Sequence, residues 1–67
     1  MEKQKQKELI TATLDQVDRA ALPLFIKDLK IKTLMRRMFG EISEDTAETI
    51  METITEYTLA HRSEVLI

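Results

Sequence analysis

A chain of 67 residues with no cysteine and one histidine cannot build a disulfide framework or a zinc site of the Cys- and His-rich kinds. Its composition, 43% hydrophobic and 33% charged with a net charge of −2, is that of one small soluble domain. A domain of this size rarely gains more than ~3–5 kcal/mol from a single core, and oligomerisation is a common supplement. We therefore expect one domain over residues 1–67 that self-associates or is completed by a partner, and that holds no cofactor.

The sequence pattern gives no indication of a targeting or membrane segment. Residues 1–7 are polar and lead into no apolar stretch, unlike a secretory signal. The apolar run at 24–26 is far shorter than the ~20 residues that span a bilayer. The sequence predicts a cytoplasmic protein with no membrane partner.

Helix is the regular structure that the turn residues favour. With one proline, Pro23, and one glycine, Gly40, the chain lacks the turn residues that all-β folds use at intervals of about 8–12 residues. These two residues divide the chain into three segments. Each segment shows helical periodicity, so the sequence predicts an all-α protein.

The first helix is expected over residues 7–21. Ile10, Leu14 and Val17 recur at helical spacing and form one apolar face. Residues 1–6, which are polar, are expected to fray. Proline disfavours helical backbone at the residue before it, so this helix should end just ahead of the next segment.

The second segment, 23–39, is apolar on more than one side. Read as one helix, it places five apolar residues on a shared face that we expect to contact the core: Leu24, Ile31, Leu34, Met35 and Met38. On the same helix Phe25, Ile26 and Leu29 point elsewhere. A bend near residues 28–30 into two short helices is therefore the alternative. One helix is favoured because no glycine, proline or asparagine marks a break there.

The third segment is the best specified. Gly40 suits the end of the preceding helix, and Ser43 is a typical N-cap. Apolar residues then recur at Ala47, Ile50, Ile54 and Tyr57. This spacing predicts a helix over 44–64. The expected fold is a small bundle of three helices, a helical hairpin plus one, completed by homo-oligomerisation and most simply by a dimer.

Charge is divided along the chain, with a net +4 over residues 1–40 and a net −6 over residues 41–67. Four carboxylates at successive i+4 positions form an acidic row: Glu44, Glu48, Glu52 and Glu56. Four cations form a basic patch opposite the expected apolar face of the second helix: Lys30, Lys32, Arg36 and Arg37. The two surfaces are either solvated, paired with each other within the fold or across a dimer, or used on a partner of opposite charge.

DNA binding is the alternative function that the basic patch suggests. Residues 29–37 loosely resemble the turn and recognition helix of a helix-turn-helix motif. The fit is poor, because Lys30 stands where glycine is common and a helix from Thr33 would have about two turns before Gly40. The alternative reading is a small helix-turn-helix-like transcriptional regulator that binds DNA through the 30–37 segment.

Catalysis and metal binding have little support in the sequence. His61 continues the apolar stripe of the third helix, which is explained by a place at the border of a core or interface. The acidic row lacks the Glu-x-x-His pair of di-iron bundles. One glycine cannot supply a phosphate-binding loop. We expect a non-enzymatic protein with no catalytic, metal-binding or cofactor-binding residues.

The remaining features favour association. The chain ends in three apolar residues, 65–67, which we expect to dock against the first helix or against a second subunit. The candidate interface combines the stripe of the third helix with this tail: Ile50, Ile54, Tyr57, His61, Val65, Leu66 and Ile67. We interpret the chain as a small regulatory or adaptor protein that acts by protein–protein interaction as a homo-oligomer.

Overall fold

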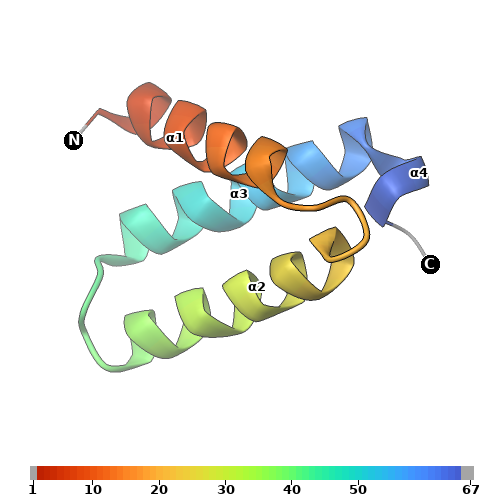
Figure 1. The fold of residues 1–67 in the computed structure, drawn as a ribbon. Helices are drawn as coiled ribbons and strands as arrows, with labels where there is room; N and C mark the ends of the chain where they lie inside the picture. Colours follow the sequence, from red (N-terminus) through yellow and green to blue (C-terminus); the bar gives the residue numbers. More distant parts are fainter. Residues whose placement is uncertain (1, 66–67) are drawn as a thin grey trace.

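The computed structural model describes residues 2–65, which form four α-helices and no strand. α1 spans Lys3–Gln16, α2 spans Leu22–Met38, α3 spans Glu44–Ala60 and α4 spans Arg62–Val65. α3 contacts both α1 and α2, which lie on either side of it (Figure 1). The prediction of an all-α protein is confirmed, with a short fourth helix that the sequence pattern did not indicate.

α1 begins earlier than the sequence pattern predicts. Residues 3–6, which were expected to fray, are helical. The reason is an ion-pair network with α3: Lys3 Nζ lies 3.5 Å from the Glu52 carboxylate, and Lys7 Nζ contacts both Glu52 and Glu56. The polar residues 3–7 are therefore part of the folded domain.

α1 also ends earlier, at Gln16, so the predicted extension to residue 21 is wrong. Val17 has extended backbone, with ψ 139°. The Arg19 guanidinium donates hydrogen bonds to the carbonyl oxygens of Leu14, at 2.6 Å, and Val17, at 2.9 Å. The orphan carbonyls at a helix end need such donors, and here one side chain supplies them while the chain turns toward α2.

α2 is one continuous helix, as favoured from the sequence, and Pro23 lies in its first turn. The prediction of which face contacts the core was wrong. Leu22, Ile26 and Thr33 are buried, and Phe25 and Leu29 pack against the core. The face expected inside, from Leu24 to Met38, is on the outside: Leu24, Ile31, Leu34, Met35 and Met38 are all exposed.

The physical reason is that α2 carries two apolar stripes, and only one can contact α3. The inner stripe ends in a small residue, Thr33, which is buried, and α3 buries two further threonines, Thr49 and Thr53. The hydroxyls of these three threonines donate to carbonyl oxygens four residues earlier, at 2.7–3.0 Å. They can therefore be buried without an unsatisfied polar group.

The connection between α2 and α3 follows the predicted chemistry. Gly40 adopts φ 75°, and its N–H bonds to the Arg37 carbonyl while the Glu41 N–H bonds to the Arg36 carbonyl. This is the Schellman arrangement that favours glycine. Ser43 Oγ accepts a hydrogen bond from the Thr46 N–H at 3.0 Å. Both predicted caps are confirmed.

The predicted helix over 44–64 is interrupted at His61, which has φ −124° and ψ 43°. α4 then turns back against α2 and α3. Val65 packs against the buried cluster, and Glu64 reaches Arg19. The break exists because a straight helix would carry these two residues away from the contacts they make. Leu66 and Ile67 lie outside the described residues.

The core is small and centred on α3. Its fully buried large side chains are Leu14, Leu22 and Ile54, with Ile26 and Tyr57 completing the cluster. Each of the three long helices contributes to it. The core therefore joins α1, α2 and α3 at the end of the molecule where α4 turns back.

Candidate functional site

The most prominent surface feature is the outer face of α2. We call it the outer strip and define it as the five apolar side chains that were expected in the core: Leu24, Ile31, Leu34, Met35 and Met38. Their exposed fractions range from 43% to 78%. Single exposed apolar residues are common, but five on one face of one helix form a contiguous apolar surface, which makes the outer strip a candidate interaction site.

The basic patch borders this strip and does not form one surface. Thr33, in the middle of the basic arc, is buried against the core. The arc is thereby divided into two pairs, Lys30 with Arg37 on one side of α2 and Lys32 with Arg36 on the other. Lys32 forms an exposed ion pair with Asp28 at 3.0 Å.

The other three cations of the patch are unpaired: within residues 2–65, no carboxylate lies within 4.0 Å of the charged groups of Lys30, Arg36 or Arg37. The helix-turn-helix alternative loses its geometric basis. Residues 29–32, which that motif requires as a turn, lie inside the continuous helix α2. The basic side chains are present on α2, but they do not lie on a separate recognition helix that follows a turn.

The acidic row is partly used within the fold. Lys7 Nζ donates to Glu56 at 2.8 Å and to Glu52 at 3.2 Å. These hydrogen bonds raise the pKa of Lys7, and the bond from Lys7 lowers the pKa of Glu52, with the charges of Lys3 and Lys7 acting in the same direction. The row is thus compensated by lysines of α1 and not by the basic patch.

The other half of the row, Glu44 and Glu48, is exposed. No cation lies within ion-pair distance of either residue among those the structure describes. The acidic row therefore consists of one half that is part of the fold and one half that is solvated.

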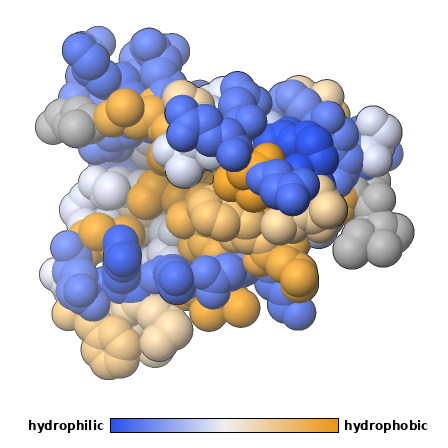
Figure 2. Space-filling view, in the orientation of Figure 1, coloured by the Kyte–Doolittle hydropathy of each residue, from blue (hydrophilic) through white to orange (hydrophobic). Residues whose placement is uncertain are grey.

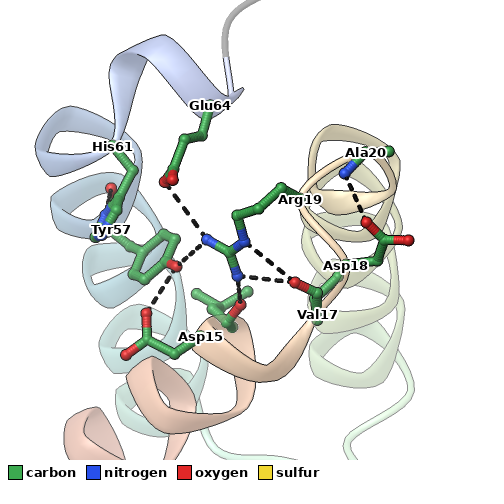
Figure 3. Close-up of polar contacts among 9 residues, drawn as sticks. Asp15, Val17, Asp18, Arg19, Ala20, Tyr57, His61 and Glu64 are labelled. Carbon is green, nitrogen blue, oxygen red and sulfur yellow. Dashed lines mark hydrogen bonds and ion pairs between the residues drawn. The ribbon is translucent and has the colours of Figure 1, made fainter.

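A polar network joins α1, the connection between α1 and α2, α3 and α4 (Figure 3). Tyr57 Oη donates a hydrogen bond to the Asp15 carboxylate at 2.9 Å and accepts one from the Arg19 guanidinium at 2.9 Å. The same guanidinium lies 3.4 Å from the Glu64 carboxylate. Burial raises the pKa of Tyr57, and the hydrogen bond to Tyr57 raises the pKa of Arg19. Because the Tyr57 hydroxyl and the Arg19 guanidinium both have partners in the chain, this network is explained by a role in stabilising the fold.

The sequence analysis missed Arg19, which it placed only off the apolar face. The signal that could have found it is its position between the first helix and Pro23, where a helix end leaves carbonyl groups without donors. His61 stacks on Tyr57 with ring centroids 4.0 Å apart, and its Nδ1 lies 3.0 Å from the Tyr57 carbonyl oxygen. It borders the core, as expected.

Most residues of the predicted interface on the third helix pack into the core of the single chain. Ile54 and Tyr57 are buried within the single chain, so they cannot contact a partner without unfolding. Ile50 and Val65 are half-buried against the same cluster. The periodicity identified an apolar face correctly, but this face is the one that α1 and α2 cover.

A second apolar surface lies between α1 and α2 and was not foreseen. We call it the trough and define it as three hollows, of about 230, 220 and 100 Å³, that share lining residues. The apolar residues along it are Leu9 and Ile10 of α1, Phe25 and Leu29 of α2, Ile50 of α3, and Ile42. Figure 2 shows apolar side chains gathered in the centre of this face, between hydrophilic side chains over α1 and α2.

Metal binding and membrane crossing can be checked directly over the described residues. Over residues 2–65, no three His, Cys, Asp or Glu side chains are grouped so that they could hold a metal ion. None of the helices in that range has the length and apolar character needed to cross a bilayer. In comparisons with known proteins, no family model, curated protein or solved structure matches this chain.

Proposed function

We propose that this protein is a small non-catalytic regulatory or adaptor protein that acts by protein–protein interaction and self-associates through the outer strip. The observation that carries the proposal is the exposure of five large apolar side chains on one side of α2. Removing each from water at an interface contributes about 25 cal/mol per Å² of apolar surface.

A second copy of the chain is the occupant that the strip fits best by shape. The strip lies along a single helix, so a two-fold axis can bring two copies together face to face. Leu24, Ile31 and Met38 are spaced seven residues apart, with Leu34 beside them, which is the spacing of a helix–helix seam. Because Lys30 and Arg37 lie at its edge in both copies, added salt should strengthen this self-association.

The test is a sedimentation measurement of molecular mass on three proteins. Wild type should have twice the mass of one chain at micromolar concentration, and a double variant, Leu24→Gln with Met35→Gln, should be monomeric while retaining its helix content. Leu59→Gln is the matched control, because Leu59 is 63% exposed on α3 outside the strip. A monomeric wild type, or a dimer that the double variant leaves intact, would contradict the proposal.

A further inference from the structure

We propose that the trough between α1 and α2 binds a short amphipathic helix of a partner protein, one that carries carboxylates along one edge. This inference rests on the proposed function in one respect, that the protein acts by binding proteins. It concerns a different surface from the outer strip, and it names the chemistry of the partner.

The arrangement of the helices provides the space. α1 and α2 both pack on α3 (Figure 1). The trough is lined by residues of α1 and α2, on the face where Figure 2 shows apolar side chains gathered. Its α2 wall extends from Phe25 to Arg36, which corresponds to about 16 Å of helix at 1.5 Å per residue. A helix of about three turns fits this length. Its apolar residues at i, i+3 or i+4, and i+7 would occupy the three hollows, as in other helix-in-groove complexes.

The lining favours an apolar helix over a small molecule. Leu9, at the α1 wall, is 53% exposed. The largest of the three hollows of the trough is bordered by almost entirely apolar surface. The Thr13 hydroxyl donates to the Leu9 carbonyl at 2.9 Å, so it does not require a partner. The two larger hollows are open to solvent. A small ligand would stay largely wet there, whereas ligand sites usually bury most of the ligand surface.

Charge decides the kind of helix. The charged residues that line the trough are Lys32 and Arg36, both on the α2 wall, and no carboxylate lines any of its three hollows. Arg36 makes no ion pair with any residue in 2–65, whereas Lys32 contacts Asp28 at 3.0 Å in an exposed ion pair. Carboxylates on one edge of a bound helix would meet these two cations. A positive rim of this kind contributes to the choice and orientation of a partner more than to its affinity.

The same charges argue against a second copy as the occupant. The exposed apolar face that another copy offers is the outer strip, which is bordered by Lys30 and Arg37. Placing it in the trough would bring these cations toward Lys32 and Arg36. Like charges brought together at an interface oppose binding, so the partner is a different chain.

The first experiment compares two synthetic peptides of about 14 residues, long enough for three helical turns. Both carry leucine at i, i+4 and i+7, and one edge is lined with glutamate in the first peptide and with lysine in the second. Fluorescence anisotropy against the full chain at low salt should show binding of the glutamate peptide at least about tenfold tighter, with the difference shrinking as salt is added. Equal affinities, or stronger binding of the lysine peptide, would overturn the proposal.

Variants of the full chain locate the binding. Arg36→Glu should reverse the preference between the two peptides, and Leu9→Glu should weaken both by about tenfold, since it places a charge in the apolar wall. Leu24→Ala, on the outer strip, should leave both affinities unchanged. Unchanged binding with Leu9→Glu, or a dimer mass that Leu9→Glu abolishes, would overturn the inference. Because self-association is scored separately on the outer strip, its failure and the failure of this inference are distinguishable.

Discussion

α1 and α2 both pack on α3, but different interactions position them. α1 is joined to α3 by ion pairs from Lys7 to Glu52 and Glu56 in addition to the buried Leu14. Within residues 2–65 no ion pair joins α2 to α3, and α2 is positioned by burial of residues such as Ile26. The same kind of packing is therefore oriented by charge on one side of α3 and by shape on the other.

This difference determines which charged and apolar side chains remain exposed for the proposed interactions. The charges of α1 that face α3 are neutralised inside the fold, whereas the cations of α2 lie at the rims of two apolar surfaces, the outer strip and the trough. A helix that is held by one apolar stripe keeps its second stripe and its charges for association. α2 is thus both a structural element and the main element of the proposed interaction surfaces.

The largest expected effect comes from breaking the α2 contact with the core. Ile26→Ala removes a side chain that is 4% exposed, and such changes typically cost about 2–5 kcal/mol. In a domain of this size that is comparable to the whole free energy of unfolding. We expect Ile26→Ala to be largely unfolded at 25 °C, as measured by circular dichroism.

Ile31→Ala is the matched control, because it is the same substitution on the same helix. Ile31 is 48% exposed on the outer strip, so the monomer should lose about 0.5 kcal/mol or less. The comparison must be made below the concentration at which the chain self-associates. Equal losses in the two variants would show that the two stripes of α2 are not inner and outer as described.

A smaller loss of stability is expected from breaking the polar network at the C-terminal end of α1. Tyr57→Phe removes the hydroxyl that accepts from Arg19 and donates to Asp15 while keeping the ring that stacks on His61. The loss should be about 1 kcal/mol, the usual net contribution of such a hydrogen bond. Urea unfolding measures it.

The control for that measurement is Thr55→Val. Its hydroxyl donates only to a carbonyl of its own helix, and the residue is exposed. If Tyr57→Phe costs no more than this control, the network does not hold α4 and α1 together.

Much of the fold could be predicted because it depends on local chemistry. Gly40 and Ser43 mark their helix ends through backbone geometry and hydrogen bonds within a few residues. The face of α2 could not be predicted in this way. Leu24 and Ile26 belong to stripes of similar apolar character, and the choice between them depends on α3, which lies elsewhere in the sequence.

The break at His61 and the role of Arg19 are non-local for the same reason. A helical pattern continues through His61, and only the contacts of Glu64 and Val65 with distant residues favour the turn. Predicting the trough would have required the relative positions of α1 and α2, and the periodicity of a sequence does not give these positions. The outer strip therefore consists of residues that the sequence pattern assigns to the core, whereas Phe25 and Leu29 of the trough are residues that it places off that face.

The smallest effect tests the acidic row, where two neighbouring positions should respond with opposite signs. Glu48→Lys removes a like-charged neighbour at i+4 from both Glu44 and Glu52, and each such pair opposes the helix by about 0.2–0.5 kcal/mol. The free energy of unfolding should therefore rise slightly. Glu52→Lys should lower it, because it replaces the carboxylate that Lys3 and Lys7 contact with a third cation.

The pH dependence separates the ion pair from simple helix propensity. The pKa of Glu52 is lowered in the folded state, so its contribution is present above the pKa of an unfolded glutamate and is lost as pH falls through the folded value. The pKa of Lys7 is raised, so its contribution is lost only as pH rises through its folded value. The stability difference between wild type and Glu52→Gln should hold at neutral pH and disappear in acid. Glu48→Gln should not lower stability at neutral pH, because it removes like charges at i+4 and no ion pair. A loss in that variant that matches Glu52→Gln would mean that the row acts as a whole and not through its contact with α1.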